Sequence, residues 1–424
     1  MSARGVASFL ILAAGVAATS WAADVAPTAK PAADQSMADS TLIARGAELA
    51  AIGNCASCHT HPEGKSFAGG RPIKTPFGTL YSTNITPDNE TGIGKWSAED
   101  FLRAMHDGVA PGRRNLYPAF PYDHFTRLTD NDVEAIYAFV MTREPVRLTA
   151  PPNQLAFPMN LRSALSVWKV LFLERGAYRP DPQQDAEWNR GAYLVEGLGH
   201  CGACHTPRNA MGAEEHTRDF DGGQSEGWDA PALNSSSPAP SAWTAEQLYA
   251  YLRQGRDENH GTAVGPMKPV VDNLSQVPES DVRAIARYVA WRMNRGQLVR
   301  VAATSSDSAQ TVVGDGEAIF RGACASCHEA EASGGPIRSG RTVPLSLTTS
   351  VNAPDARNAI HIVLEGIWPD AGEKGAFMPP FEGAFTEQQL AALLGYVRSR
   401  YARGPAWSDL PKQVRAIMHT GQKQ

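Results

Sequence analysis

The sequence predicts an all-α chain in which three small helical domains follow one another. Three observations lead to this fold class. The length of 424 residues is about three times a usual domain size. A glycine-led segment, a C-x-x-C-H cluster and an amphipathic stretch recur three times in the same order. Runs of alternating β-branched residues, which would indicate strands, do not stand out along the chain.

Composition limits the classes of function that need to be considered. Charged residues make up 20% and hydrophobic residues 42% of the chain, as in an ordinary folded protein. Lysine and arginine number 39 against 44 acidic residues, so the formal net charge is 39 − 44 = −5. This mildly acidic balance gives no reason to expect a nucleic acid as partner.

The N-terminal residues 1–22 have the parts of a secretory signal peptide. A single positive charge at Arg4 precedes an apolar run over residues 6–18, and Ser20 and Ala22 supply small residues for cleavage. The run is shorter than the ~20 residues of a membrane-spanning helix. We therefore expect cleavage after Ala22 and an exported protein, with a retained anchor as the alternative.

The repeated unit gives the order of the domains. Its glycine, at Gly46, Gly191 and Gly316, stands 9, 10 and 8 residues before the first cysteine of the cluster (55 − 46, 201 − 191, 324 − 316). Such a glycine lets a second helix approach the backbone closely. The domains are expected at residues 40–146, 186–298 and 314–404.

Each unit also ends in a predicted amphipathic helix. Apolar residues recur there at i, i+3, i+4 and i+7, and Thr129 and Thr386 are candidate N-caps. The residues between and after the units are expected to be an irregular linker with a short amphipathic helix at 147–185, a second linker at 299–313, and an amphipathic tail at 405–424. Either amphipathic segment could contact a membrane surface or another protein segment.

All six cysteines belong to the three C-x-x-C-H clusters, which is the attachment pattern of c-type haem. Two thiols bond to the porphyrin, and the adjacent histidine ligates the iron. A zinc site would need four protein ligands, and a disulfide framework would not need the histidine. The sequence therefore predicts three covalent haems, attached at Cys55, Cys58, Cys201, Cys204, Cys324 and Cys327, with His59, His205 and His328 on the iron.

Methionine is a frequent second axial ligand in such proteins and raises the reduction potential. Met378 lies just before the last helix of the third unit, and Met267 precedes the last helix of the second. Both are predicted iron ligands.

The first unit departs from this pattern, because Phe120 stands in the corresponding stretch. Either its iron has a displaced ligand or one side of it is open. The available donors are Met141, which we favour, and Met105, Met159, His106 and His124. Other histidines, including His200 beside the second cluster, are expected to be surface or packing residues.

With these residues in hand, the chain resembles the three-haem cytochrome c subunits of bacterial membrane-bound dehydrogenases. The resemblance covers nearly the whole mature chain. Its marks include Asn-Ile-Thr-Pro-Asp at 84–88, Trp-Asn-Arg-Gly at 188–191 and His-Thr-Pro-Arg-Asn at 205–209. The stretches at 122–126 and 137–143 resemble especially the cytochromes that accompany molybdenum hydroxylases such as aldehyde or nicotinate dehydrogenase.

The resemblance implies three tandem class I cytochrome c domains that perform no substrate chemistry themselves. It implies electron transfer from a separate catalytic subunit, which would be a molybdenum hydroxylase, a quinoprotein or a flavoprotein, to ubiquinone. It further implies a peripheral position at the periplasmic face of the cytoplasmic membrane. Two alternatives remain: a free periplasmic shuttle to a terminal oxidase, and a haem peroxidase that uses an open iron in the first unit.

Overall fold

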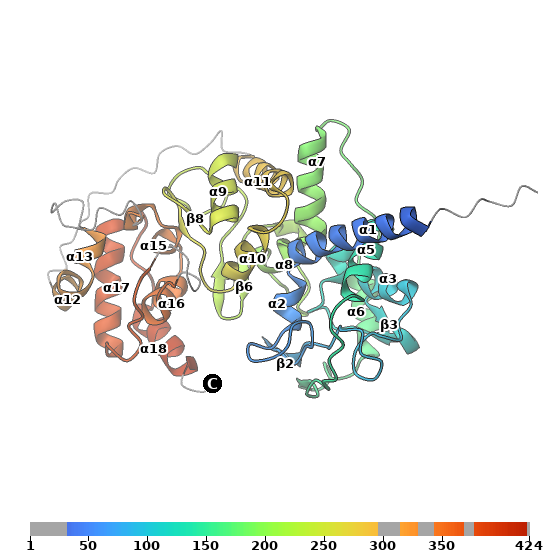
Figure 1. The fold of residues 1–424 in the computed structure, drawn as a ribbon. Coiled ribbons are helices and arrows are strands. Elements are labelled where there is room, and N and C mark those ends of the chain that lie inside the picture. The colour runs from blue at the N-terminus through green and yellow to red at the C-terminus, as the bar shows by residue number, and fades with distance from the viewer. Residues whose placement is uncertain (1–31, 296–313, 330–342, 369–376, 422–424) are drawn as a thin grey trace, which may run out of the picture. The chain divides into compact units, whose positions relative to one another are not determined.

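The computed structural model describes residues 32–295, 314–329, 343–368 and 377–421, and the predicted signal peptide lies outside these ranges (Figure 1). Two compact units are distinguished, Met1–Thr41 and Leu42–Gln424. The first contributes the start of helix α1, and all three C-x-x-C-H clusters lie in the second. Among the described residues, no helix has the length and apolar character needed to cross a bilayer.

The helices and strands follow the order of the three predicted units. The first unit contains α1 (Ala32–Ile52), α2 (Cys55–His59), β1 (Pro72–Thr75), β2 (Gly78–Tyr81), α3 (Ala98–Asp107), β3 (Val109–Ala110), η1 (Pro111–Arg113), β4 (Arg114–Asn115), α4 (Tyr122–Phe125) and α5 (Asp130–Val140). The segment after it contains β5 (Gln154–Leu155) and α6 (Ala164–Phe172).

The second unit contains α7 (Ala186–Tyr193), the π-helical η2 (Leu194–Leu198), α8 (Gly202–His205), η3 (His216–Arg218), β6 (Gly223–Ser225), β7 (Trp228–Ala230), α9 (Ala245–Gln254), β8 (Arg256–Asp257), β9 (Gly261–Thr262), α10 (Met267–Leu274) and α11 (Glu279–Asn294). The third contains α12 (Asp315–Ala323), α13 (Ala325–His328), η5 (Leu345–Leu347), α15 (Thr349–Asn352), α16 (Arg357–Glu365) and α17 (Glu387–Tyr401), and α18 (Leu410–Gly421) follows.

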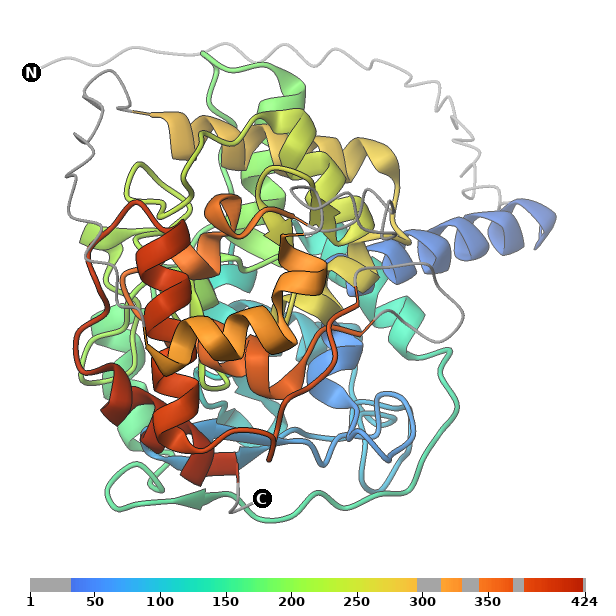
Figure 2. The same ribbon diagram turned by 90° about the vertical axis from the view of Figure 1, so that its left-hand side faces the viewer.

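The same helix crossing occurs in all three units. A Cβ atom added to Gly46 on α1 would lie 1.9 Å from the carbonyl oxygen of Ala135 on α5. A Cβ atom on Gly191 of α7 would lie 2.0 Å from the Ala284 oxygen of α11. One on Gly316 of α12 would lie 2.2 Å from the Ala392 oxygen of α17. Figures 1 and 2 show α12 beside α17. The glycine is therefore needed at each crossing, because any side chain would overlap a backbone oxygen.

The N-caps of α5 and α17 are the threonines predicted from the sequence, Thr129 and Thr386. Thr386 and Gln389 form a reciprocal capping box at the start of α17, whereas Thr129 accepts a hydrogen bond from the Asp132 amide at the start of α5. These bonds satisfy amide groups that have no partner within the helix.

Two large hydrophobic cores hold the described helices together, and a smaller cluster contains Tyr122, Trp168, Leu173 and Ala213. One is shared by the first and second units and includes Leu49, Ile136, Leu198 and Val282. The other belongs to the third unit and includes Phe320 and residues of α16, α17 and α18. The first two units thus have a continuous core.

A charge cluster joins the first two units where their closing helices begin. Arg190 binds Asp281 through two hydrogen bonds of 2.8 and 2.9 Å, and Arg45 lies 3.5 Å from the same carboxylate. Asp132 accepts a 2.7 Å hydrogen bond from the Tyr193 hydroxyl and lies 3.7 Å from Arg45. Each arginine precedes its crossing glycine, so the two units contribute equivalent residues.

The strands are short and were not expected from the sequence. β1, β2 and β5 form a three-stranded sheet, while β3–β4, β6–β7 and β8–β9 are antiparallel pairs. Strands of two to four residues are too short to produce a recognisable alternation of side chains. They shape the loops around the helices, and the all-helical character of the core is retained.

The two amphipathic segments have different environments. On α18 and just before it, Trp407, Leu410 and Val414 are buried in the core of the third unit. On α6, Leu165 and Trp168 are buried and Phe172 is partly buried. Several apolar side chains on α6 and just before it are exposed: Phe157, Leu161, Val167, Val170 and Leu171. The segment therefore has a buried side, which packs near Tyr122 of the first unit, and an exposed side, which includes Leu161 and Leu171.

Candidate haem-binding sites

The three C-x-x-C-H clusters form short helices at equivalent places in the three units. They occupy α2, α8 with the residue before it, and α13 with the residue before it. All six cysteines are free in the structure, so no disulfide joins the two cysteines of a cluster. Within each helical turn the histidine directly follows the second cysteine, as covalent haem attachment requires.

Two of the three cluster histidines are oriented by a backbone carbonyl. The His59 Nδ1 atom lies 2.7 Å from the Thr83 oxygen, and the His205 Nδ1 atom lies 2.6 Å from the Pro231 oxygen. A carbonyl only accepts, so each Nδ1–H donates and the lone pair is placed on Nε2. This is the arrangement that fixes the tautomer of a metal-ligating histidine.

The electrostatic environment keeps these imidazoles neutral. Burial lowers the pKa of His59 and of His205, although the carbonyl hydrogen bonds oppose the shift. Burial also lowers the pKa of His328. The His328 Nδ1 atom is buried and has no hydrogen-bond partner among the described residues. A neutral imidazole is the form that binds iron.

The first cysteines of the first and second clusters, Cys55 and Cys201, are not activated thiols. Burial, followed by the neighbouring cysteine of the cluster, raises the pKa of Cys55 and of Cys201 to about 12. Reactive cysteines have lowered pKa values beside cations or helix N-termini. The first and second clusters therefore do not fit a thiol-redox site or a nucleophile.

Met267 is tied to the same hairpin as His205. It begins α10, and its loop packs on β7, because a Cβ atom on Gly265 would lie 2.6 Å from the Trp228 ring. β7 leads directly to Pro231, whose carbonyl orients His205. The packing therefore joins the segment that carries Met267 to the segment whose carbonyl orients His205, the two predicted axial ligands of the second haem.

Met378 is held by backbone pairing in the third unit. Its amide and carbonyl exchange hydrogen bonds of 2.9 Å with Ile367, just after α16. A Cβ atom on Gly366 would lie 2.5 Å from the Met378 oxygen, so the two segments are in close contact. The side chain of Met378 is partly exposed, and its role as an iron ligand stays a prediction.

Phe120 occupies the place in the first unit that Met267 has in the second. Both units continue from a ten-residue helix, α3 or α9, through a left-handed glycine into a two-stranded pair. Phe120 and Met267 each lie five residues beyond the end of that pair (120 − 115 and 267 − 262). The first unit therefore has no sulfur donor at this position.

The other donors considered for the first haem differ in availability. Both ring nitrogens of His124 are hydrogen-bonded, so His124 is not available as a ligand. Met105 is 3% exposed in the core, and Met141 is partly buried at the end of α5. Met159 is partly buried in the linker, whereas the His106 Nε2 atom is buried without a hydrogen-bond partner among the described residues. Met141 remains our predicted ligand.

A buried polar cluster beside the second C-x-x-C-H was missed by sequence analysis. Asp123, His124 and Glu214 present ligand-type atoms that all lie within 4.8 Å of one another. The one available signal was Gly202, which stands where the other two clusters have Ala56 and Ala325. The sequence alone does not show why glycine stands there, because Glu214 and His124, which lie closest to Gly202, are distant in the chain.

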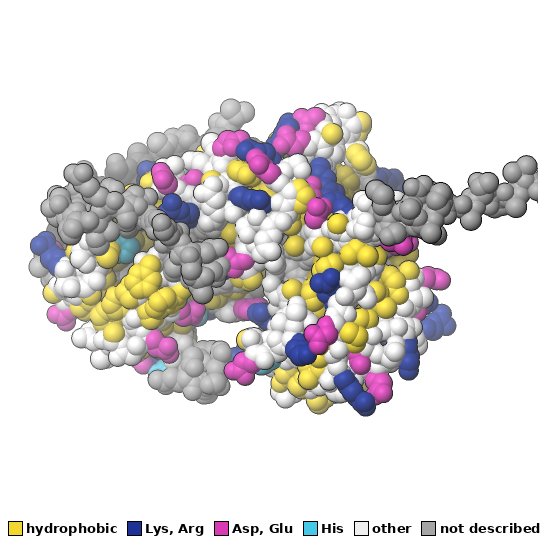
Figure 3. All heavy atoms as spheres, viewed as in Figure 1, with side chains coloured by type: hydrophobic (Ala, Val, Ile, Leu, Met, Phe, Trp, Pro, Cys, Tyr) yellow, Lys and Arg dark blue, Asp and Glu magenta, His cyan; other side chains and the backbone are white. Residues whose placement is uncertain are grey.

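The residues present fit covalent haem. Each unit supplies two free thiols and an adjacent histidine, and two of the histidines are held in the iron-binding tautomer. Apolar side chains gather over α16 and α17 of the third unit, as Figure 3 shows. Helical units with these clusters define a cytochrome c.

Comparison with known proteins specifies the class further. The cytochrome c family model matches residues 43–144 and 313–400. The chain is 34% identical over 404 residues to the fructose dehydrogenase cytochrome subunit of Gluconobacter japonicus, covering 88% of this chain and 82% of that protein. It is 35% identical to the gluconate 2-dehydrogenase cytochrome c subunit of Pantoea cypripedii, covering 90% of each. The chain belongs to the family of cytochrome c subunits of membrane dehydrogenases.

A further relative is longer than this chain. It is a nicotinate dehydrogenase subunit of Pseudomonas putida, 45% identical over 401 residues, which are 93% of this chain but 33% of that protein. The chain thus spans a third of the length of that relative.

Proposed function

We propose that this chain transfers electrons from the catalytic subunit of a periplasmic dehydrogenase to ubiquinone, through three covalently attached haems. The observation that carries the proposal is the threefold recurrence of a C-x-x-C-H helix beside a glycine-mediated helix crossing. Each haem, when bound, supplies reversible one-electron oxidation and reduction of iron. The protein residues hold the group, orient its histidine ligand and limit its access to water.

The repeated crossing supports three tandem class I cytochrome c domains at residues 40–146, 186–298 and 314–404. The six cysteines of the C-x-x-C-H clusters would attach the haems, and His59, His205 and His328 would be the first axial ligands. Met267 and Met378 would be the second axial ligands of the second and third haems. The matched positions of Met267 and Phe120 support this difference between the haems.

The catalytic partner is part of the proposal. Relatives named as cytochrome subunits accompany fructose, gluconate and alcohol dehydrogenases. The Pseudomonas putida relative, at 45% identity, is named a nicotinate dehydrogenase subunit. This favours a molybdenum hydroxylase over a quinoprotein or flavoprotein as partner.

If electrons pass through the three haems one after another, in a serial path, each haem is needed for ubiquinone reduction, and the third haem can be tested. His328→Ala should remove its first axial ligand and abolish ubiquinone reduction by the assembled complex. Reduction of an artificial acceptor by the catalytic partner should continue. His419→Ala, which changes a histidine exposed on α18, is the matched control and should leave both rates unchanged. Unchanged ubiquinone reduction in His328→Ala would contradict the serial path.

The exposed face of α6 supports contact with the membrane surface. Val170 is 85% exposed, and Val167 and Leu171 are about 60% exposed. On the opposite side, the Lys169 ammonium donates to the Gly108 oxygen at 2.7 Å, which anchors the helix to the first unit. Burying one such side chain contributes ~1.5–3 kcal/mol.

Vesicle binding tests this contact. Val170→Glu should weaken co-sedimentation with phosphatidylglycerol-containing vesicles by about tenfold, the change that ~1.4 kcal/mol produces. Leu148→Glu, at a partly exposed site outside α6, is the control. Equal binding by both variants and the unchanged protein would argue against α6 as the contact.

Two alternative functions make different predictions. A peroxidase would bind cyanide at the first haem, and the missing sulfur at Phe120 is the observation that favours it. Electron transfer predicts three low-spin haems and no cyanide complex. A free periplasmic shuttle would purify alone and reduce a terminal oxidase, whereas the proposed subunit would co-purify with its dehydrogenase.

A further inference from the structure

The Asp123–His124–Glu214 cluster lies directly against the backbone of the second C-x-x-C-H. A Cβ atom on Gly202 would be 3.0 Å from Glu214 Oε2 and 3.0 Å from His124 Cε1. Contacts this short are tighter than alanine normally makes, so the glycine leaves room for the cluster. The two other C-x-x-C-H helices have alanine at this position.

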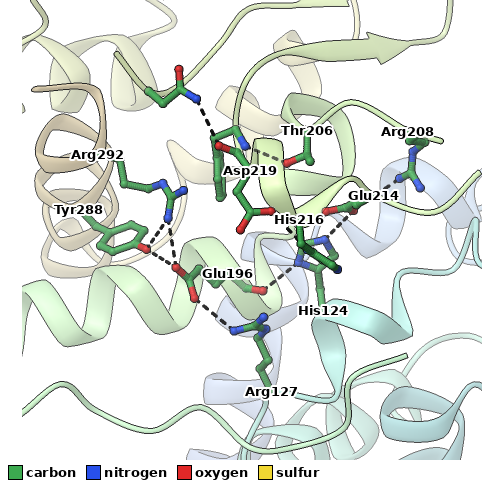
Figure 4. A network of polar contacts seen from close by, with 12 residues as sticks. His124, Arg127, Glu196, Thr206, Arg208, Glu214, His216, Asp219, Tyr288 and Arg292 are labelled. Atoms are coloured by element: carbon green, nitrogen blue, oxygen red, sulfur yellow. Dashed lines mark hydrogen bonds and ion pairs between the residues drawn. The ribbon is translucent and has the colours of Figure 1, made fainter. Parts of the chain in front are cut away.

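His124 is held between two acceptors. Its Nδ1 atom lies 2.8 Å from the Glu196 carbonyl oxygen, and its Nε2 atom lies 2.8 Å from Glu214 Oε1 (Figure 4). A carbonyl and an ionised carboxylate only accept hydrogen bonds, so the ring bears both protons when Glu214 is ionised. Burial opposes this charge, but the hydrogen bond and charge of Glu214 outweigh it and raise the pKa of His124.

Asp123 adds a second carboxylate to the same imidazolium. Its Oδ1 atom is buried and has no hydrogen-bond partner among the described residues. Burial therefore raises the pKa of Asp123 more than the charge of His124 lowers it. Glu214 is already paired with His124, so Asp123 is the carboxylate that can gain a proton without breaking a described hydrogen bond.

Charged groups from several elements face the cluster. The Arg208 guanidinium lies 3.6 Å from Glu214 and donates to the carbonyl oxygen of Ala203, which lies within the C-x-x-C-H itself. The His200 ring approaches from the residue before the cluster, with its centroid 6.5 Å from that of His124. Other ionisable neighbours among the described residues are Cys204, Tyr122 on α4, His216 on η3, and the Glu196 side chain with its partners Arg127, Tyr288 and Arg292.

We propose that Asp123 couples reduction of the haem attached at Cys201 and Cys204 to uptake of one proton, with His124 and Glu214 positioning it. The iron gains one electron, which the dehydrogenase partner supplies, and an Asp123 oxygen gains one proton from solvent. The net charge at the site is then unchanged. In a buried environment an uncompensated charge interacts strongly with its neighbours, which favours this coupling. The inference rests on the proposed function for the presence of the haem.

Potentiometric titration of the haem-loaded protein between pH 5 and 9 tests the coupling. One of the three reduction potentials should fall as the pH rises, with a limiting slope of about 59 mV per pH unit for one proton per electron. Asp123→Asn should abolish the slope. Asp130→Asn, which removes an exposed carboxylate of the same unit, is the matched control and should retain it.

Two further measurements keep the inference falsifiable if Asp123→Asn folds poorly. In the unchanged protein, the redox difference infrared spectrum should gain a protonated-carboxyl band on reduction. Glu214→Gln should alter the pH range of the slope without removing the haem. Three potentials independent of pH, or a slope retained in folded Asp123→Asn, would overturn the inference. Lack of haem at Cys201 and Cys204 would instead contradict the proposed function.

Discussion

Gly316 and Gly322 lie on the same helix, α12, and test the helix crossing directly. A Cβ atom on Gly316 would lie 2.2 Å from the Ala392 oxygen, whereas ordinary contact begins near 3.4 Å. Gly316→Ala therefore requires the helices to separate by more than 1 Å, since 3.4 − 2.2 = 1.2. Overpacking of this kind costs ~1–3 kcal/mol. Gly322 has nothing within 4 Å, so alanine there should stabilise the helix by up to ~1 kcal/mol.

The assay is urea unfolding of the full haem-loaded chain, followed by circular dichroism. For the third unit, Gly316→Ala should lower the free energy of unfolding by about 2 kcal/mol, while the m value remains unchanged. Gly322→Ala should leave this free energy equal or higher. Equal effects of the two substitutions would refute the close crossing, because both add the same methyl group to the same helix.

Three other changes have defined outcomes. Arg398→Met should destabilise the third unit by about 2–4 kcal/mol in urea unfolding. The reason is that Arg398 is 4% exposed and donates hydrogen bonds to the carbonyls of Val351, Ala353 and Pro405. Arg400→Met, at an exposed site, should change the free energy of unfolding little. Glu214→Gln should lower stability most between about pH 4.3 and 6.5. In that range Glu214 is ionised, because its folded pKa is lowered, and His124 is protonated, because its folded pKa is raised. The stabilisation is lost as the pH falls through the folded pKa of Glu214, and also as the pH rises through the folded pKa of His124. Met267→His should lower the potential of one haem, because methionine ligation raises it, and a potential unaffected by the change would exclude Met267 as a ligand.

The sequence predicts those parts of the fold whose signals lie close together in each repeated unit. The glycine, the C-x-x-C-H and the closing helix are contiguous signals, and the helix caps at Thr129 and Thr386 were correctly anticipated. The strands were not, because pairs such as β8–β9 contain only two residues each. The buried stripe of α18 was ambiguous in sequence, since only tertiary contacts show that Val414 packs into the third core.

The candidate site could be predicted only in part, because some of its residues are distant in sequence and meet only in the folded chain. The predicted haem-binding residues of each unit are adjacent in sequence, whereas Asp123 and Glu214 come from different units and meet through packing. The carbonyls that orient His59 and His205 come from Thr83 and Pro231, whose side chains carry no signal for this role. The C-x-x-C-H pattern therefore predicts the cofactor but leaves its surroundings undetermined.

Intact mass spectrometry of the protein, produced in cells that can mature c-type cytochromes, tests the central claim most directly. We expect a chain that begins after Ala22 and whose mass exceeds that of the polypeptide by three haems. Cys201→Ser with Cys204→Ser should reduce the excess to two. A polypeptide with six free thiols and no attached porphyrin would show that the C-x-x-C-H clusters do not bind haem.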